Sequence, residues 1–249
     1  MTTVKIDWTE PPANWSPPAD QVDVWAASLS QSTNLLSSRK SVLSTDELTR
    51  AERFRFDQDR NRFVAGRGLL RVILGRYLGL KPGVLSFTYR LRGKPALAEQ
   101  CGGRRLHFNV THSDDLILVA VSTICDVGID VEQIRPLSDA DDIAARYFTS
   151  GESAGLRELP AAQKPRAFFN LWTRKEAWLK ATAEGISDSL NRVEVSFLPG
   201  EPARLIRLFG SCEAVQEWSL CELTPASGYI GALAAPVKQV PINCWRWPE

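Results

Sequence analysis

The chain has little histidine and methionine, and its cysteines follow no recognisable spacing. Only two histidines, His107 and His112, occur among 249 residues, which excludes a metal centre built from several histidines. The five cysteines are scattered without a CxxC pair, which favours reduced thiols over a disulfide framework or a zinc site. If the protein is an enzyme, carboxylates and basic residues therefore have to carry most of its chemistry.

Long apolar runs and an excess of one charge are absent as well. No apolar run approaches the ~18 residues of a membrane helix, and Pro-Pro stands where a signal peptide has its apolar core. The 30 Lys and Arg against 29 Asp and Glu leave a formal net charge of +1, which argues against coating of nucleic acid. The composition, 44% hydrophobic and 24% charged, is that of a globular protein. We expect a cytoplasmic protein that binds neither membranes nor nucleic acid.

Two stretches of the sequence repeat one order of elements. Ser44 and Glu47 have the spacing of a capping box at the start of a long helical pattern. VLSFTY, a Gly-Lys-Pro turn, a strand and LILVAVS follow that pattern. A second helical stretch at 139–184 is followed by VEVSFL, Gly-Glu-Pro, strands and GYIGALAA. The echo predicts an α+β fold of two similar α/β subdomains, residues 1–136 and residues 137–249.

Three short apolar segments, at 106–113, 116–122 and 127–132, follow one another with acidic turns between them. They predict an antiparallel meander. The first and third strands of a meander are parallel, and their ends lie about 10 Å apart at one edge, because neighbouring strands are about 4.8 Å apart. That gap fits a diphosphate and its metal ion, with His112 at its rim. The alternative is that His112 merely begins a turn.

Asp130 and Glu132 lie two residues apart at the end of the third segment, so both side chains leave the same face of a strand. Adjacent carboxylates repel each other unless a cation lies between them, and Mg²⁺ is the usual cation beside phosphates. An exposed strand end that turns polar is the alternative. Glu176 and Lys180, four residues apart on a helix, would complete the site if that helix packs over the meander. An ordinary helix-stabilising ion pair is the other explanation for them.

The first helical pattern is rich in arginine. Its arginines are Arg50, Arg53, Arg55, Arg60, Arg62, Arg67, Arg71 and Arg76. Guanidinium groups suit phosphate oxygens, as does Lys94 in the Gly-Lys-Pro turn, although a solvated helix face explains several of the arginines. Gly66 and Gly68 weaken a helix by about 1 kcal/mol each, which indicates that another group approaches the backbone there. Nucleic acid is the rival source of phosphate, and the near-zero net charge disfavours it.

Together these segments resemble the Sfp-type 4′-phosphopantetheinyl transferases. The resemblance rests on GKP at 93–95, FNVTHS at 108–113, VGIDVE at 127–132, FFNLWTRKEAWLKATAEG at 168–185 and RNRFVAGRGLLR at 60–71. It implies two α+β halves related by a pseudo-twofold axis, with coenzyme A and Mg²⁺ in the cleft between them. It also implies a monomer.

The resemblance further implies a role for each candidate residue. The metal ligands would be Asp130, Glu132 and Glu176. Coenzyme A would lie along Arg62, Arg67, Lys94, Pro95, Thr111, His112, Asp130 and Lys180. The catalytic residues would be Asp130, Glu176 and Lys180. Among these, Glu176 would accept the proton of a carrier-protein serine, directly or through a metal-bound water, and Lys180 would offset charge on the leaving oxygen.

The implied reaction transfers the phosphopantetheine arm of coenzyme A to a serine of an apo acyl or peptidyl carrier protein, and releases adenosine 3′,5′-bisphosphate. Such carriers serve fatty acid, polyketide or non-ribosomal peptide synthesis, and no motif in the sequence selects among them. Two other interpretations stay open. One is a catalytically silent relative that binds carriers or coenzyme A. The other is a nucleic-acid-binding module built on the arginine-rich helix, which predicts steeply salt-dependent binding.

Overall fold

The protein is represented by a computed structural model that describes residues 7–17, 19–89, 93–102, 105–183 and 190–248. The end of the FFNLWTRKEAWLKATAEG segment, at 184–185, lies outside the described residues. Within the described residues, none of the helices combines the length and the apolar character needed to cross a membrane.

The arginine-rich segment folds as a helical layer beside the first sheet. Its helices are α1 (Thr33–Lys40), α2 (Thr45–Glu52) and α3 (Asp57–Leu78). The predicted capping box begins α2, since the backbone N–H of Ser44 donates to Glu47 Oε2 at 3.0 Å. The group that approaches Gly68 of α3 is helix α1, because a Cβ on Gly68 would come within 2.6 Å of Arg39 O. That glycine therefore serves helix packing.

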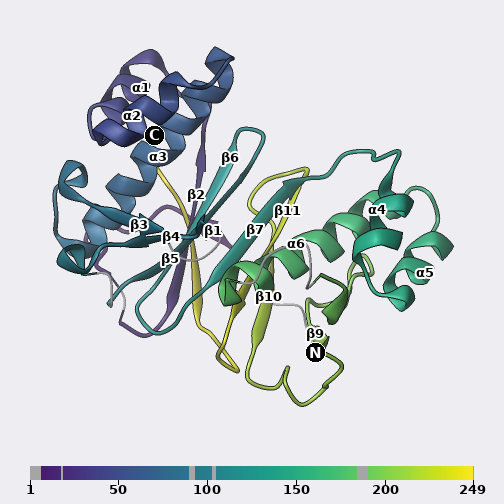
Figure 1. Cartoon of the computed structure of the whole chain (residues 1–249). Helices are drawn as coiled ribbons and strands as arrows, with labels where there is room; N and C mark the ends of the chain where they lie inside the picture. Colours follow the sequence, from purple (N-terminus) through teal and green to yellow (C-terminus); the bar gives the residue numbers. More distant parts are fainter. Residues whose placement is uncertain (1–6, 18, 90–92, 103–104, 184–189, 249) are drawn as a thin grey trace.

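Two sheets form the centre of the molecule (Figure 1). The first has the strand order β1-β12-β2-β6-β5, and the second has the order β10-β11-β7. Their strands are β1 (Trp8–Thr9), β2 (Val22–Ser28), β5 (His107–Ser113), β6 (Leu116–Ser122), β7 (Gly128–Gln133), β10 (Ser219–Leu223), β11 (Tyr229–Ala235) and β12 (Ile242–Arg246). Two hairpins pair β3 (Phe87–Tyr89) with β4 (Pro95–Leu97) and β8 (Val193–Val195) with β9 (Leu205–Leu208).

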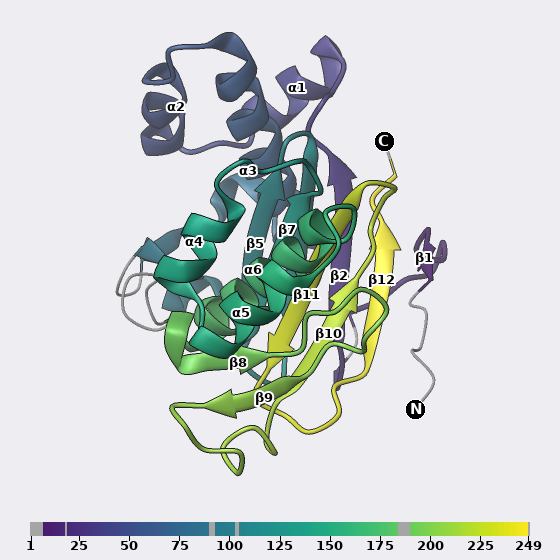
Figure 2. The same cartoon turned by 90° about the vertical axis from the view of Figure 1, so that its right-hand side faces the viewer.

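The second sheet is covered on one face by helices (Figure 2). They are α4 (Ala140–Tyr147), α5 (Ser150–Glu158) and α6 (Lys164–Thr182). Short 3-10 turns occur at η1 (Pro82–Val84), η3 (Glu99–Cys101) and η4 (Leu190–Arg192). Helix α6 packs along β7 and β11, so the strand that carries the predicted carboxylates lies beneath the helix that carries Glu176.

The predicted duplication is visible in the order of elements. In the first half, β2 is followed by α3, the β3–β4 hairpin, β5 and β6. In the second half, β7 is followed by α6, the β8–β9 hairpin, β10 and β11. The sheets repeat the order too, as β2-β6-β5 and β7-β11-β10. The α+β fold of two similar subdomains is thereby confirmed. The division at residue 136 stays a prediction. Strand β7 precedes that residue but lies in the second sheet, and β12 follows it but lies in the first sheet.

The predicted meander is wrong in its third strand. Strands β5 and β6 pair as an antiparallel hairpin, as expected, but β7 pairs with β11. The physical reason is that β2 occupies the other edge of β6, which leaves β6 no free edge for β7. Strand β7 instead runs parallel beside β5, so Thr111 and Asp130 meet at 3.0 Å and the expected gap of about 10 Å does not exist.

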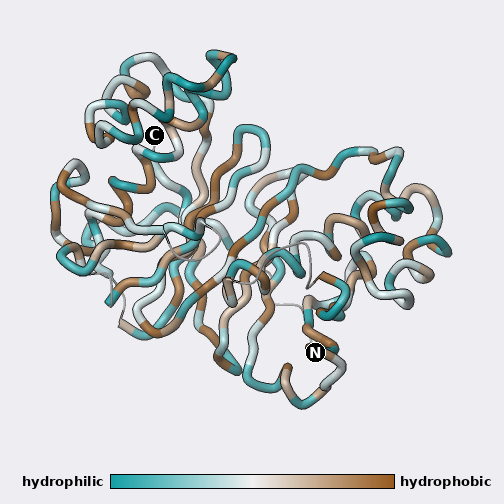
Figure 3. The backbone as a smooth tube through the Cα atoms, viewed as in Figure 1, coloured by the Kyte–Doolittle hydropathy of each residue, from teal (hydrophilic) through white to brown (hydrophobic). Residues whose placement is uncertain are grey.

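An apolar layer joins the two sheets. It includes Val24 and Leu118 of the first sheet and Ile129, Val131 and Leu233 of the second, all at most 1% exposed. Burial of each such side chain contributes about 1.5–3 kcal/mol. Figure 3 shows hydrophobic stretches along the central strands, whereas the helices alternate between hydrophobic and hydrophilic residues. The two halves therefore share a core that fixes β5 against β7.

The tryptophan-rich C-terminus forms β12, which lies parallel to β2 in the first sheet. Its Trp245 Nε1 donates to Asp23 Oδ1 at 3.0 Å, and Asn243 Nδ2 donates to the same oxygen at 3.1 Å. The Tyr77 hydroxyl donates to Asp23 Oδ2 at 2.5 Å. The last strand thus completes a buried hydrogen-bond network.

Candidate active site

Helix α6 lies directly on β7 because β7 begins with glycine. A Cβ on Gly128 would come within 2.0 Å of Ala177 O and 2.3 Å of Ala181 N, so no larger residue permits this approach. Glu176 and Lys180, one helical turn apart, are thereby placed over the carboxylates of β7. The close contact between helix and strand is what assembles the site.

Asp130 is buried at the centre of this arrangement. Its Oδ1 accepts from Lys180 Nζ at 2.6 Å and from Thr111 Oγ1 at 3.0 Å. Its Oδ2 is buried and has no hydrogen-bond partner among the described residues. Burial raises the pKa of Asp130, and the nearby Glu132 charge adds to that rise, while Lys180 opposes it. The unpaired oxygen is available to a cationic ligand.

Glu176 is the second buried carboxylate. Burial raises its pKa to about 7, and the charge of Asp130 contributes to the rise. Its Oε1 is buried and unpartnered within the described part of the chain. A carboxylate whose pKa is close to neutral can both accept and release a proton under physiological conditions. Lys180 forms its ion pair with Asp130 across two elements, so the explanation of Glu176 and Lys180 as an ordinary helical pair does not account for it.

Glu132 is held at the rim of the cluster. Its Oε2 accepts from Ser113 Oγ at 2.8 Å and from Arg135 at 3.5 Å. The side chain is partly exposed, and both contacts are made to the same oxygen. The alternative of a merely polar strand end does not explain this directed contact.

The carboxylates match the chemistry of a divalent cation site. Among the described residues, no three Asp, Glu, His or Cys side chains converge closely enough to bind a cation in their present positions. Asp130 Oδ2 and Glu176 Oε1 are nevertheless both buried without partners, and the negative charges of Asp130, Glu132 and Glu176 destabilise one another. A hard cation with oxygen ligands would relieve both costs. The residues fit Mg²⁺, and their role as its ligands stays a prediction.

A pocket of about 590 Å³ lies beside the carboxylates. The predicted coenzyme-binding residues in its wall are Arg62, Arg67, Pro95 and His112. Ser113, whose hydroxyl contacts Glu132, lines the pocket as well. Ser113 thus links the pocket to Glu132 of the carboxylate cluster.

Arg62 and Arg67 are held in place by carboxylates. Arg62 Nε donates to Asp115 Oδ1 at 2.8 Å, and its NH2 group pairs with Asp114. Arg67 pairs with Glu47 and lies 4.0 Å from the centre of the Phe87 ring. Fixed guanidinium groups at a pocket wall can bind phosphate without further ordering.

Two predicted coenzyme-binding residues, Lys94 and Thr111, do not line this pocket. Lys94 Nζ donates to Lys180 O at 2.6 Å and to Val127 O at 3.2 Å. It therefore ties the β3–β4 hairpin to the C-terminal end of α6, where a cation is favourable. Thr111 is buried and its hydroxyl donates to Asp130. The structure thus brings Thr111 to the carboxylate cluster, whereas the contacts of Lys94 are made to the backbone of Val127 and Lys180.

His112 lines the pocket, and its pKa is lowered there. Desolvation lowers its pKa, and the positive charges of Lys180 and Arg62 lower it further. These effects favour the neutral imidazole over the protonated form. A bound phosphate beside it would favour the protonated form.

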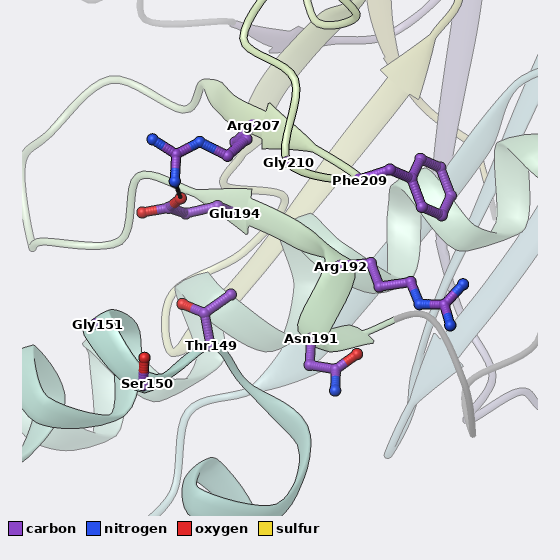
Figure 4. A pocket seen from close by; sticks show the side chains of 9 residues that line it. All are labelled: Thr149, Ser150, Gly151, Asn191, Arg192, Glu194, Arg207, Phe209 and Gly210. Carbon is purple, nitrogen blue, oxygen red and sulfur yellow. Dashed lines mark ion pairs between the residues drawn. The ribbon is translucent and has the colours of Figure 1, made fainter.

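A second pocket, of about 660 Å³, lies at the start of α5 and at the β8–β9 hairpin (Figure 4). Arg207 and Glu194 in its wall form an ion pair at 3.5 Å, marked in the figure. Phe209 and Arg192 project from the same rim. None of the residues predicted from the sequence to bind or react lines this pocket.

Sequence reasoning missed three residues that shape the site. Ser113 and Asn109 reach from β5 to β7, and Gly128 allows α6 to close on β7. The polar residues at positions 109, 111 and 113 alternate along FNVTHS, which is the period of one strand face. That alternation could have identified Asn109 and Ser113.

Comparison with known proteins identifies the family. Residues 126–234 match the model of the 4′-phosphopantetheinyl transferase superfamily, and residues 23–124 match that of the 4′-phosphopantetheinyl transferase N-terminal domain. The chain is 43% identical over 227 residues to the 4′-phosphopantetheinyl transferase HetI of Nostoc sp., which covers 91% of this chain and 92% of the relative. It is 32% identical over 197 residues to the 4′-phosphopantetheinyl transferase psf-1 of Bacillus pumilus, and the match covers 76% of this chain and 82% of the relative. It is 28% identical over 155 residues to the 4′-phosphopantetheinyl transferase Sfp of Bacillus subtilis, and the match covers 62% of this chain and 66% of the relative.

The chain belongs to the 4′-phosphopantetheinyl transferase superfamily. The resemblance inferred from the sequence motifs is thereby confirmed. The protein is accordingly a transferase that moves a phosphopantetheine group to carrier proteins.

Proposed function

We propose that the chain transfers the 4′-phosphopantetheine arm of coenzyme A to a serine hydroxyl of an apo acyl or peptidyl carrier protein, with release of adenosine 3′,5′-bisphosphate. The observation that carries this proposal is the convergence of Asp130, Glu176 and Lys180 beside a pocket with arginines in its wall. Phosphoryl transfer needs cations around the phosphates and a group that accepts the proton of the attacking hydroxyl.

The pocket would hold the nucleotide part of coenzyme A. Arg62, Arg67 and His112 in its wall supply hydrogen-bond donors for phosphate oxygens. Each arginine is already oriented by a carboxylate, so binding costs little side-chain entropy. Lys94 would support Lys180 through its backbone oxygen, and Thr111 would support Asp130 through its carboxylate.

Asp130, Glu132 and Glu176 would hold Mg²⁺. When bound there, the cation would neutralise charge on the phosphate oxygens. Glu176 would accept the proton from the carrier serine, a role for which a pKa of about 7 is well matched. Lys180, held against Asp130, would place its ammonium beside the phosphate oxygen that leaves.

The location and the assembly are part of the proposal. All five cysteines are free in the structure, which fits a reducing compartment such as the cytoplasm. The two halves share one core and the site lies within a single chain, which supports an active monomer.

Intact-mass spectrometry of apo carrier proteins tests the reaction. Carriers of fatty acid, polyketide and non-ribosomal peptide synthesis are incubated separately with the protein, coenzyme A and Mg²⁺. The expected result is a gain of one phosphopantetheine on at least one carrier, lost when a chelator is added. Coenzyme A binding without a gain on any carrier would favour a catalytically silent relative. Salt-sensitive binding of nucleic acid without coenzyme A binding would contradict the proposal.

A further inference from the structure

Strand β5 presents alternate side chains to the pocket and to β7, and Ser113 at its end reaches both. Val110 and His112, at even positions, line the pocket. Asn109, Thr111 and Ser113, at odd positions, reach across to β7. This alternation follows from the two-residue period of a strand. One strand therefore forms both the wall of the pocket and the support of the carboxylates.

Side chains take the place of a backbone ladder between β5 and β7. These strands belong to different sheets, so no ladder joins them in the described structure. Asn109 Oδ1 accepts from Ile129 N at 2.9 Å at one end of the contact. Ser113 Oγ accepts from Gln133 N at 3.1 Å at the other end. Two backbone N–H groups of β7 on this side, those of Ile129 and Gln133, are thereby satisfied by β5.

The Ser113 hydroxyl is oriented by this arrangement. A serine hydroxyl has one proton and two lone pairs. Since a lone pair of Ser113 Oγ accepts from the Gln133 N–H, its proton is free to point at Glu132 Oε2, which lies at 2.8 Å. The bond is charge-assisted and restricts rotation of the Glu132 carboxylate. Ser113 also lines the pocket, so it contacts both parts of the site.

We infer that Ser113 is a positioning residue of the transferase, whose hydroxyl fixes Glu132 in the orientation needed to bind the cation. This inference rests on the proposed function. Partners that orient a metal ligand typically change metal affinity about 10–100-fold when they are removed. Ser113 would act through Glu132 and would take no part in the transfer of a proton.

The test compares Ser113→Ala with Ser113→Thr, which keeps the hydroxyl. Ser122→Ala is the matched control, because Ser122 is a buried serine at the far end of the neighbouring strand whose Oγ also accepts backbone N–H groups. Mg²⁺ binding is measured by titration calorimetry on each full-length variant without carrier. Thermal unfolding and the kcat and KM for coenzyme A are measured alongside.

Ser113→Ala is expected to weaken Mg²⁺ binding about 10-fold and to lower kcat, with Ser113→Thr within about 2-fold of the unmodified protein. Ser122→Ala is expected to lower the melting temperature without changing the Mg²⁺ dissociation constant. Unchanged Mg²⁺ binding in Ser113→Ala, or an equal loss in Ser122→Ala, would overturn this inference alone. Failure of the unmodified chain to bind Mg²⁺ and to modify any carrier would overturn the proposed function, and this inference with it.

Discussion

Each half of the molecule buries an aspartate on the strand that precedes its long helix. Asp23 on β2 is 0% exposed and Asp130 on β7 is 5% exposed. Asp23 accepts hydrogen bonds from the neutral donors Tyr77, Asn243 and Trp245, which involve both of its oxygens. One oxygen of Asp130 accepts a hydrogen bond from the ammonium group of Lys180. Its other oxygen has no hydrogen-bond partner in the described part of the chain.

The difference between these carboxylates teaches that burial alone does not identify an active site. A buried acceptor whose lone pairs are satisfied stabilises the fold and has no capacity left for a ligand. A buried acceptor that is partly unsatisfied costs stability, and proteins commonly accept that cost where a ligand will complete the site. On this basis we propose that Asp23 is structural and that Asp130 belongs to the catalytic machinery.

The largest effect is expected from Asp130→Ala. This change removes a proposed cation ligand and the partner of Lys180, so transfer should fall about 1000-fold or more. The fold should persist, because a partly unsatisfied buried charge is removed together with the side chain. Transfer is measured by the mass assay and folding by circular dichroism. Near-normal turnover by the folded variant would remove Asp130 from the site.

The next effect is expected from Gly128→Ala. A methyl group at this position would overlap Ala177 O, so α6 must move away from β7. Displacement of a catalytic group by about 1 Å can cost about 100-fold in rate. Overpacking of this kind also lowers the free energy of unfolding by about 1–3 kcal/mol. Gly151→Ala, at a position where a Cβ meets nothing within 4 Å, is the matched control in rate and urea-unfolding measurements.

Asp23→Ala should produce the opposite pattern. It leaves buried donors on Tyr77, Trp245 and Asn243 without their acceptor, at a cost of about 1–3 kcal/mol for each group left unsatisfied. The urea midpoint should therefore fall, while kcat per folded molecule should stay close to that of the unmodified protein. A loss of kcat in the still-folded variant would contradict the assignment of Asp23 to structure.

Much of the fold follows from local sequence patterns. The capping box at Ser44 and the repeated order of elements in the two halves are local features, and each is present. The prediction of a third meander strand was wrong because strand pairing depends on which strand edges are free. Nothing near Gly128 in the sequence records that β2 already occupies the edge of β6.

The candidate site was predicted from its chemistry more completely than from its geometry. With only two histidines in the chain, carboxylates such as Asp130 and Glu176 are the expected carriers of its chemistry, and the structure brings these two together. The partners of Lys94 could not be predicted, because they are backbone carbonyls of distant segments. Backbone acceptors leave no trace in residue identity, and the same holds for the N–H group that orients Ser113.

The smallest effect expected is a change in how stability depends on pH. The pKa of Glu176 is raised from 4.5 to about 7 in the folded chain. Between these pH values the folded state holds a proton that the unfolded state has released, so the free energy of unfolding should fall as pH rises through this window. Glu176→Gln removes that proton exchange and should flatten the pH dependence of stability.

Urea unfolding in the presence of a chelator, from about pH 5 to about pH 7, measures the slope for each protein. Asp130 is retained in both proteins, so the difference between the slopes reports Glu176 together with its electrostatic coupling to Asp130. Equal slopes would mean that the Glu176 carboxylate is ionised throughout this range, which would remove the basis for its role as a base tuned by burial.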